Sequence, residues 1–222
     1  MSVKICELFD LSHTLAATYL AALTYPWEAL HSLSSWIVEI GQRLLHQEYE
    51  QSAPDVWIHK TARIAPTAAI GGPCIIGAES ELRHGAYIRG SALIGSACVV
   101  GNSVEIKHAI LFDGVQVPHY NYVGDSILGY RAHMGAGAIA SNVKADHSPV
   151  VVHDGTEIYA TGRKKLGAML GDYAEIGCNS VLNPGTIIGK NSTVYPLSCV
   201  RGCLPADSIY KKDGLIVKKS IS

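Results

Sequence analysis

A six-residue repeat governs most of this 222-residue chain. An apolar residue recurs at every sixth position, first in one unbroken run and then, after interruptions, in two shorter ones. These anchors are Ile58, Ile64, Ile70, Ile76, Leu82, Ile88, Ile94, Val100, Ile106 and Phe112, then Leu128, Met134 and Ala140, then Leu170, Ile176, Leu182, Ile188, Val194 and Val200. A helix repeats every 3.6 residues and a strand every two. A period of six is instead typical of a parallel β-helix, in which short strands meet at tight corners.

The composition of the repeat agrees with such corners. Four residues after an anchor the side chain is usually small, as at Ala62, Ala68, Cys74, Ser80 and Ala86. Apolar residues make up 48% of the chain, but only 7% of residues are aromatic and 22 are glycine. Small and β-branched side chains suit a narrow core of flat strands. The sequence therefore predicts a mainly β fold, with a parallel β-helix over residues 53–205.

Helices are expected ahead of the solenoid, over residues 1–52. One helix is predicted from Thr14 to Leu23, with Asp10 or Ser12 as its cap, and a second from Trp27 to about His46. The apolar residues of the second have helical spacing: Leu30, Leu33, Ile37, Ile40 and Leu44. Because the ends of a solenoid need a cover, we expect this helical hairpin to cap an open end or to pack on a neighbour.

Two further hairpins are predicted. Residues 146–169 interrupt the repeat, and within them Val150–Val152 and Glu157–Tyr159 flank a turn-forming His-Asp-Gly-Thr sequence. Residues 206–222 form a C-terminal tail with a second hairpin around Asp213-Gly214.

The charge balance excludes several classes of partner. With 18 basic and 19 acidic residues the net charge is −1, which argues against broad electrostatic binding to nucleic acid or an anionic membrane. No apolar run approaches the roughly 20 residues that span a bilayer, and the N-terminus lacks the pattern of a signal peptide. We therefore expect a cytoplasmic protein without nucleic-acid or membrane partners.

The cysteines suggest neither a metal site nor a disulfide framework. No two of them form a Cys-x-x-Cys pair, so a structural zinc site is not expected. In a reducing cytoplasm we expect free and mostly buried thiols. The six are Cys6, Cys74, Cys98, Cys178, Cys199 and Cys203.

Stacking arithmetic draws attention to two cations. The six-residue repeat resembles that of the hexapeptide-repeat transferases, and this resemblance implies three hexads in each 18-residue coil. Residues 18 apart should then lie one above the other on successive coils, about 4.8 Å apart. Arg89 and Lys107 are 18 apart, and each directly follows an anchor. Two such charges would repel unless an anion lay between them, and a phosphate would satisfy both. The alternative is that both are solvated cations that point outward.

His119 lies where the repeat breaks. Pro118 takes an anchor position and the register slips just after it, so His119 is expected at an irregular, open site. A histidine can act as a general base near neutral pH, although a single histidine is more often structural.

The residues around His119 resemble the hexapeptide-repeat acyltransferases. The segments are Val117-Pro118-His119-Tyr120-Asn121-Tyr122-Val123-Gly124-Asp125, Met134-Gly135-Ala136-Gly137 and Ser141-Asn142. They are similar to the acetyltransferase half of bacterial N-acetylglucosamine-1-phosphate uridylyltransferase/glucosamine-1-phosphate acetyltransferase, and to archaeal sugar-1-phosphate nucleotidylyltransferases with an acetyltransferase tail. The resemblance runs from about Arg89 to Val200. It implies a left-handed β-helix with three hexads in each coil.

The resemblance also implies a reaction. It points to an N-acetyltransferase that uses acetyl-CoA as co-substrate, requires no metal and acts on an amino-sugar 1-phosphate resembling glucosamine 1-phosphate. His119 would remove a proton from the sugar amine, and Glu105 would orient or charge-balance His119. The sugar phosphate would be held by Arg89, Lys107, Tyr122, His133, Asn142 and Lys165. Coenzyme A would lie near Ala136, Cys178 and Pro196, with a backbone N–H around Ala136 as the oxyanion donor.

Further expectations concern partners. The resemblance implies a parallel homotrimer with sites between subunits, in which Lys165 of the insertion reaches a neighbouring subunit's site. The sequence contains no glycine-rich nucleotidyltransferase loop, so a separate nucleotidyltransferase is a possible partner.

Two alternatives stay open. His133 stands where the family has Asn, Val143 stands where it has Tyr, and the family's C-terminal Arg near coenzyme A has no match. These differences favour a non-catalytic trimeric scaffold or a regulatory partner of a separate sugar nucleotidyltransferase. A zinc enzyme of the γ-carbonic anhydrase type would need three converging histidines. The available ones, of which no two are 18 apart, are His84, His108, His119 and His133.

Overall fold

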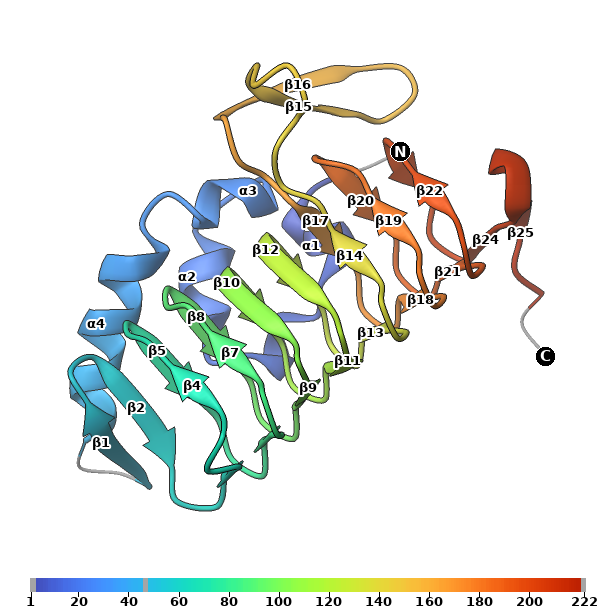
Figure 1. Ribbon diagram of the computed structural model, residues 1–222. Helices are drawn as coiled ribbons and strands as arrows, with labels where there is room; N and C mark the ends of the chain where they lie inside the picture. The colour runs from blue at the N-terminus through green and yellow to red at the C-terminus, as the bar shows by residue number, and fades with distance from the viewer. Residues whose placement is uncertain (1–2, 46–47, 221–222) are drawn as a thin grey trace.

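The computed structural model describes residues 3–45 and 48–220, and its central feature is a left-handed parallel β-helix (Figure 1). Each coil contains short strands separated by corners, and the strands of successive coils pair in parallel. The pairing of Cys74 with Ala92 and of Ile76 with Ile94 shows the 18-residue coil directly. The predicted fold class is confirmed.

The strands lie on three faces. The first face holds β4 (Ala69–Ile70), β7 (Tyr87–Ile88), β14 (Ile139–Ala140), β19 (Val181–Leu182) and β22 (Cys199–Val200). The second holds β2 (Val56–His59), β5 (Cys74–Ile76), β8 (Ala92–Ile94), β17 (Ala168–Leu170), β20 (Thr186–Ile188) and β23 (Cys203–Leu204). The third holds β3 (Arg63–Ile64), β6 (Glu81–Leu82), β9 (Val99–Asn102), β11 (Gln116–His119), β13 (His133–Met134), β18 (Glu175–Ile176), β21 (Thr193–Val194) and β24 (Ser208–Tyr210). Two longer strands, β10 (Glu105–Leu111) and β12 (Tyr122–Leu128), pass through the corner between the first and second faces.

The anchors form the core. From Ile76 onward every predicted anchor is buried, whereas Ile58, Ile64 and Ile70 are only half-buried because they belong to the first coil, at the end of the stack. Polar corner residues are satisfied internally: the Ser80 hydroxyl donates to Gly95 O at 2.6 Å and accepts from Cys98 N at 2.9 Å.

The register slip lies earlier than predicted. Ile88 pairs with Ile106, 18 residues on, but Ala92 pairs with Ala109, only 17 residues on. The corner between the first and second faces therefore loses one residue, at the point where β10 runs straight through it. Consequently Val117, and not Pro118, stacks above Val100 and is fully buried.

The N-terminal segment is divided into shorter helices than predicted. They are α1 (Ile5–Leu8), a 3₁₀ turn (Leu11–His13), α2 (Ala17–Ala21), α3 (Pro26–Ala29) and α4 (Leu33–Leu44). Asp10 caps the 3₁₀ turn by accepting a hydrogen bond from Ser12 N at 3.0 Å. Ala16 N donates to the Thr14 hydroxyl, so α2 begins only at Ala17 and not at Thr14 as predicted. The predicted end near His46 lies outside the described residues. Beyond it, β1 (Tyr49–Ala53) pairs antiparallel with β2.

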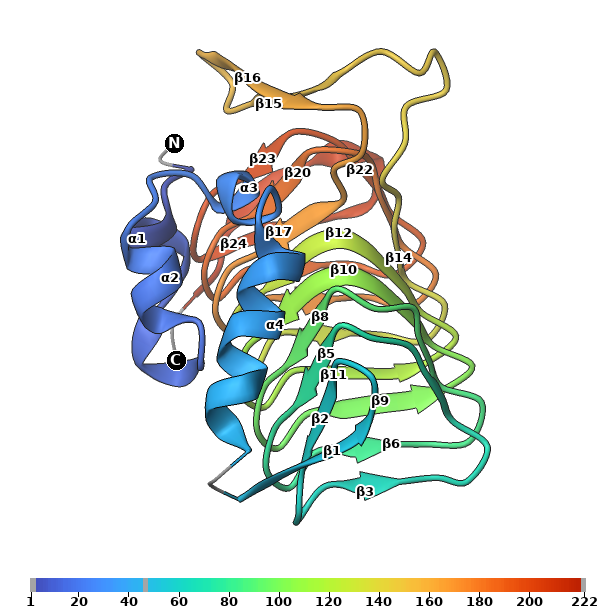
Figure 2. The same cartoon turned by 90° about the vertical axis from the view of Figure 1, so that its left-hand side faces the viewer.

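These helices lie along the second face of the solenoid and not across its end (Figure 2). Helix α4 packs on β2, β5 and β8 through its buried residues. Further along the axis the Phe9 and Phe112 rings lie 5.1 Å apart, and Asp10 N donates to the Asp172 carboxylate at 2.7 Å. The N-terminal helices therefore form a wall along the side of the solenoid and do not cap its end as predicted. The apolar stripe of α4 is long enough to contact several coils.

Two antiparallel hairpins interrupt and end the solenoid. The insertion between β14 and β17 contains β15 (Val150–His153) and β16 (Ile158–Arg163), which stand off the coils (Figure 1). Its Tyr159 ring lies 5.4 Å from Tyr25 and 6.2 Å from Trp27 of the N-terminal segment. At the C-terminal end β24 pairs with β25 (Ile216–Lys218) through a 3₁₀ turn at Lys212–Gly214.

All six thiols are free, as predicted, but fewer of them are buried than expected. Cys74 and Cys98 are buried, and burial raises the pKa of each to about 12. Cys6, Cys178 and Cys199 are exposed, because they lie outside the inward-facing positions of the repeat. Within residues 3–45 and 48–220, no helix is long and apolar enough to cross a membrane.

Because Gly41 lies against Trp57, replacing this glycine with alanine should destabilise the protein. A Cβ on Gly41 of α4 would collide with the buried Trp57 indole of β2. Overpacking of this kind costs about 1–3 kcal/mol, against a gain of about 1 kcal/mol in helix propensity. We expect Gly41→Ala to lower the free energy of unfolding, measured by denaturant titration. Ser35→Ala, on the exposed side of α4, is the control, and an increase in stability for Gly41→Ala would contradict this packing.

Candidate active site

Two corners on either side of the first face carry most of the predicted site residues. The Asp125 corner, between the first and second faces, stacks Lys107-His108, Gly124-Asp125 and Ser141-Asn142 on successive coils. The His119 corner, between the third and first faces, stacks His119, Ala136-Gly137, Cys178-Asn179 and Pro196-Leu197. The short strands of the first face separate the two corners.

Asp125 organises its corner. Asp125 is only 2% exposed, yet its carboxylate contacts four side chains, of which three belong to the coils. His108 Nδ1 lies 2.7 Å from Oδ1, Asn142 Nδ2 donates to Oδ2 at 2.6 Å, and Lys107 Nζ lies 3.4 Å from Oδ2. Burial alone would raise the pKa of Asp125, but the hydrogen bonds from His108 and Asn142 and the charge of Lys107 outweigh it and lower that pKa. Asp125 is therefore a buried anion.

The insertion adds a second cation to this corner. The Arg163 guanidinium, at the end of β16, lies 3.8 Å from Asp125 Oδ1, and its side chain is 20% exposed. Burial lowers the pKa of Arg163, and the charge of Asp125 offsets this effect only in part. Lys107 and Arg163 thus share the single carboxylate of Asp125. The excess positive charge suits an anionic ligand.

Tyr122 links this corner to the first face. Its hydroxyl accepts a hydrogen bond from Asn142 Nδ2 at 3.1 Å. A Cβ on Gly124 would lie 2.5 Å from that hydroxyl oxygen, so the absence of a side chain makes the contact possible. Burial, followed by the charge of Asp125, raises the pKa of Tyr122. The hydroxyl is therefore neutral and keeps its own proton to donate.

His119 lies on an irregular turn held by Asn121. Asn121 is buried, accepts from His119 N at 3.1 Å and donates to Gly135 O at 2.8 Å. Among the described residues the exposed imidazole of His119 has no hydrogen-bond partner. An unengaged histidine at an open corner is available to accept a proton from a ligand.

The predicted coenzyme residues form a column above His119. Gly137 N donates to His119 O at 3.0 Å, Asn179 N to Ala136 O at 2.8 Å, and Leu197 N to Cys178 O at 2.9 Å. In the described part of the chain the Ala136 N–H donates to no protein group. The structure thus brings Ala136, Cys178 and Pro196 together with His119 at one corner, with a free N–H beside it.

The similarity to known proteins decides the family. A family model described as the GMPPB C-terminal domain matches residues 72–161. The uncharacterized acetyltransferase YaiX of Escherichia coli is 32% identical over 229 residues, which cover 94% of this chain and 96% of YaiX. This chain belongs to the hexapeptide-repeat acyltransferases.

Other relatives share only part of their length with this acyltransferase. The bifunctional protein GlmU of Methanococcus maripaludis is 32% identical over 136 residues, or 60% of this chain and 33% of GlmU. The acyltransferase therefore spans about a third of the GlmU relatives that it matches. A solved GDP-perosamine N-acetyltransferase from Caulobacter crescentus aligns with a TM-score of 0.32 and 17% identity, covering 74% of this chain and 57% of that one.

The structure gives the following surroundings to three further predicted site residues of the acyltransferase. Glu105 is bound by Arg89, with NH1 to Oε1 at 2.7 Å, and no hydrogen bond or ion pair joins it to His119 in the described residues. His133 lies on the third face, where its Nδ1 is 2.8 Å from Glu175 Oε2, and not at the Asp125 corner. Lys165 is exposed, and its backbone bridges Val143 of the same chain.

The stacking of Arg89 below Lys107 is as predicted, since Ile88 pairs with Ile106. The two cations nevertheless pair with different carboxylates: Arg89 pairs with Glu105, and Lys107 pairs with Asp125, which it shares with Arg163. The histidines considered for zinc are spread over different corners and faces. Among the described residues no group of three His, Cys, Asp or Glu side chains could hold a metal ion.

Sequence reasoning missed Asp125, His108 and Arg163 as site residues. Asp125 carried a signal, because it is 18 residues after Lys107 and would be expected directly above it. The shortened corner places Asp125 above His108 instead, yet close enough to bind both. Arg163 carried no positional signal, because the hairpin that presents it lies outside the repeat.

The buried network predicts a pH-dependent loss of stability in Asp125→Asn. Removing one partner of a buried ion pair costs about 3 kcal/mol or more, so we expect a loss of that size at pH 7. Because the pKa of Asp125 is lowered in the folded state, its contribution is present above the ordinary value of 3.8 and is lost as the pH falls through the folded-state pKa. Urea unfolding at a series of pH values would show the two proteins converge in acid. Glu50→Gln, which removes an exposed carboxylate of β1, should show no such convergence. If the stability of Asp125→Asn instead ran parallel to that of the unmodified protein at all pH values, the assignment of Asp125 as a buried anion would be contradicted.

Proposed function

We propose that this acyltransferase is an acetyl-CoA-dependent N-acetyltransferase that acts on an amino-sugar 1-phosphate resembling glucosamine 1-phosphate. The observation that carries the proposal is the pairing of two complementary corners across the first face. The Asp125 corner has surplus positive charge for a phosphate, and the His119 corner has a free imidazole beside a free backbone N–H.

The acceptor would bind with its phosphate at the Asp125 corner. Lys107 and Arg163 supply the charge, and Arg89 lies one coil below Lys107. Tyr122 and Asn142, on the path toward His119, offer a neutral hydroxyl and an amide to the sugar hydroxyls. Lys165, two residues beyond Arg163, is exposed and close to Asn142 through the bridge to Val143.

The acetyl donor would lie along the His119 corner. Ala136, Cys178 and Pro196 form a continuous column that an extended coenzyme can follow. The Ala136 N–H would donate to the thioester oxygen as it gains negative charge. A preorganised donor of this kind typically contributes 10²–10³ in rate.

The chemistry then follows from proton balance. The His119 imidazole takes a proton from the amino group as its nitrogen attacks the thioester carbonyl carbon, forming the C–N bond. The tetrahedral oxyanion collapses, the C–S bond breaks, and the proton on His119 passes to the departing sulfur of coenzyme A. Glu105, held by Arg89, adds a negative charge to the first face one coil below Tyr122.

A catalytic test compares His119→Ala and Lys107→Met with the unmodified protein. Thiol release from acetyl-CoA would be followed with glucosamine 1-phosphate and galactosamine 1-phosphate. We expect His119→Ala to lower kcat by about 10²-fold or more, because the general base is lost. Lys107→Met should mainly raise KM for the sugar phosphate, about tenfold for a lost charge-assisted contact.

His84→Ala is the matched control for this test. His84 lies on the same column as His119, two coils earlier, with Asn102 between them. Replacing His84 with alanine should leave kcat unchanged. No thiol release from any amino-sugar phosphate would contradict the proposal and favour the scaffold or regulatory partner.

A homotrimer with sites between subunits is part of the proposal. Large apolar side chains are exposed on the first face and at the His119 corner, including Tyr87 at 46%, Tyr120 at 66%, Ile139 at 38% and Leu197 at 79%. Contiguous exposed apolar groups are typical of an interaction surface. Arg163 and the insertion pack on their own chain, through Asp125 and Tyr25, so the neighbour is expected at the His119 side.

Sedimentation equilibrium tests the assembly. We expect a trimer for the unmodified protein and a shift toward monomer for Leu197→Asp, which places a charge on the exposed apolar surface. Leu215→Asp, at another exposed leucine that lies outside this surface, is the control. A monomeric unmodified protein would contradict the assembly.

A further inference from the structure

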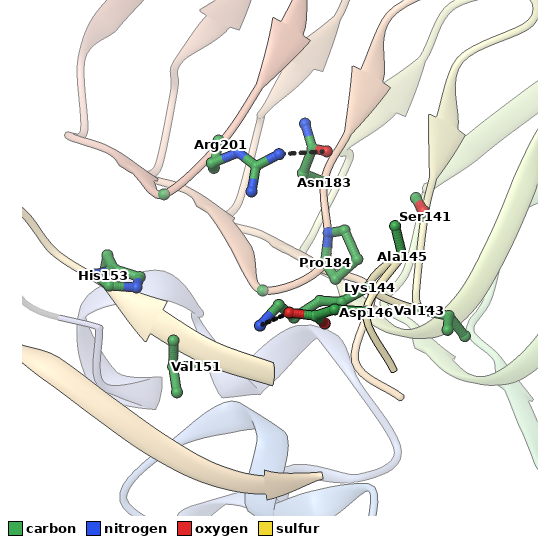
Figure 3. A pocket seen from close by; sticks show the side chains of 12 residues that line it. Ser141, Val143, Lys144, Ala145, Asp146, Val151, His153, Asn183, Pro184 and Arg201 are labelled. Atoms are coloured by element: carbon green, nitrogen blue, oxygen red, sulfur yellow. Dashed lines mark hydrogen bonds and ion pairs between the residues drawn. The ribbon is translucent and has the colours of Figure 1, made fainter. Parts of the chain in front are cut away.

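A cavity lies beside the outgoing leg of the insertion, whereas the Arg163 contact with Asp125 lies on the return side. Its volume is about 500 Å³. It opens between three parts of the chain: the outgoing leg of the insertion (143–146), strand β15, and the corner turns at 183–185 and 201–202 (Figure 3). Cavities of this size hold small-molecule ligands.

The cavity has fixed walls. Gly185 has φ +80°, and a Cβ there would lie 2.8 Å from Val151 O, so the glycine lets β15 rest against the corner. Gly185 N also donates to Gly167 O at 2.9 Å, where the insertion rejoins the solenoid. Val150 and Val152 of β15 are buried. The cavity is therefore bounded by packed backbone on the solenoid side and the hairpin side.

The lining of the cavity carries more positive than negative charge. Lys144, His153 and Arg201 line it together with one carboxylate, Asp146. Lys144 Nζ lies 3.5 Å from Asp146 Oδ2, which neutralises that pair. The Arg201 guanidinium contacts a neutral group, the Asn183 amide oxygen, at 3.4 Å (Figure 3). Within the described residues no carboxylate pairs with Arg201.

We propose that this cavity binds the phosphate or diphosphate group of a small molecule. Arg201 presents a guanidinium fork, which matches phosphate oxygens in a bidentate manner. Lys144 and His153 converge on the same space from the insertion, and Ser141 and Asn183 add a hydroxyl and an amide. Val143, Val151 and Pro184 supply apolar surface for the remainder of the ligand.

This site borders the Asp125 corner at Ser141 but takes its cations from other residues. The outgoing and return legs of the insertion run antiparallel, with Val143 bridged to Lys165. Lys144 lies on the outgoing leg and lines the cavity, whereas Arg163 lies on the return side and contacts Asp125. The inference does not depend on the proposed acetyl transfer. Two sources could supply the phosphate, namely the phosphates of coenzyme A or a separate phosphorylated metabolite.

Isothermal titration of the full chain with inorganic pyrophosphate tests the site. The titration is run in a Lys107→Met background, which removes a cation of the Asp125 corner and so separates the two phosphate sites. We expect Arg201→Gln and Lys144→Gln each to weaken pyrophosphate binding about tenfold or more. Arg83 directly follows β6 on the third face and pairs with Glu81, so Arg83→Gln should leave pyrophosphate binding unchanged.

Saturation with coenzyme A then identifies the source. Loss of the Arg201-dependent binding in its presence would assign the site to the coenzyme phosphates, and retention would assign it to a separate metabolite. Circular dichroism checks that each variant is folded. Equal pyrophosphate affinity with and without Arg201, or no pyrophosphate binding at all, would overturn the inference. Failure of acetyl transfer combined with Arg201-dependent binding would reject the proposed function and leave this site in place.

Discussion

Parallel hydrogen bonding between successive coils is the constraint on which the rest of this structure depends. It holds each coil about 4.8 Å above the last, so that residues one coil apart in sequence become neighbours in space. The buried anchors make the register unambiguous, because a shift of one residue would turn them outward. Both candidate corners exist because of this stacking. Ala136, Cys178 and Pro196 form a column, as do Lys107 and Arg89, although no two of these residues are adjacent in sequence.

A local departure from the period creates the acceptor side of the site. The corner after Ile106 has one residue fewer than the corner below it, and β10 runs straight through it. As a result Asp125 stacks above His108 and lies within reach of Lys107. A buried carboxylate is costly unless it is paired and hydrogen-bonded, and here its partners are the groups that the proposed function uses. The same interaction therefore satisfies the fold and orients the site.

The parts outside the repeat give this acyltransferase its individual features. The N-terminal helices form a wall along the second face, and the insertion packs its Tyr159 against that wall. This packing holds β16 so that Arg163 reaches Asp125. The insertion thereby separates two parts of this surface, the Asp125 corner with Lys107 and the cavity with Asn183 and Arg201. Both parts have surplus positive charge, which is why two phosphate-binding proposals arise from one hairpin.

The sequence by itself determined the solenoid and its buried anchors, because both follow from a short period repeated many times. With the 18-residue coil that the family resemblance implied, it also determined the stacking of Arg89 below Lys107. It also drew attention to His119, through the irregularity beside Pro118. Only the tertiary structure decided that Glu105 pairs with Arg89, that His133 pairs with Glu175 on another face, and that the helices form a side wall. It alone revealed Arg163 at the Asp125 corner. These contacts join segments with no shared period, so their partners are set by packing and charge between distant elements, which a sequence pattern does not encode.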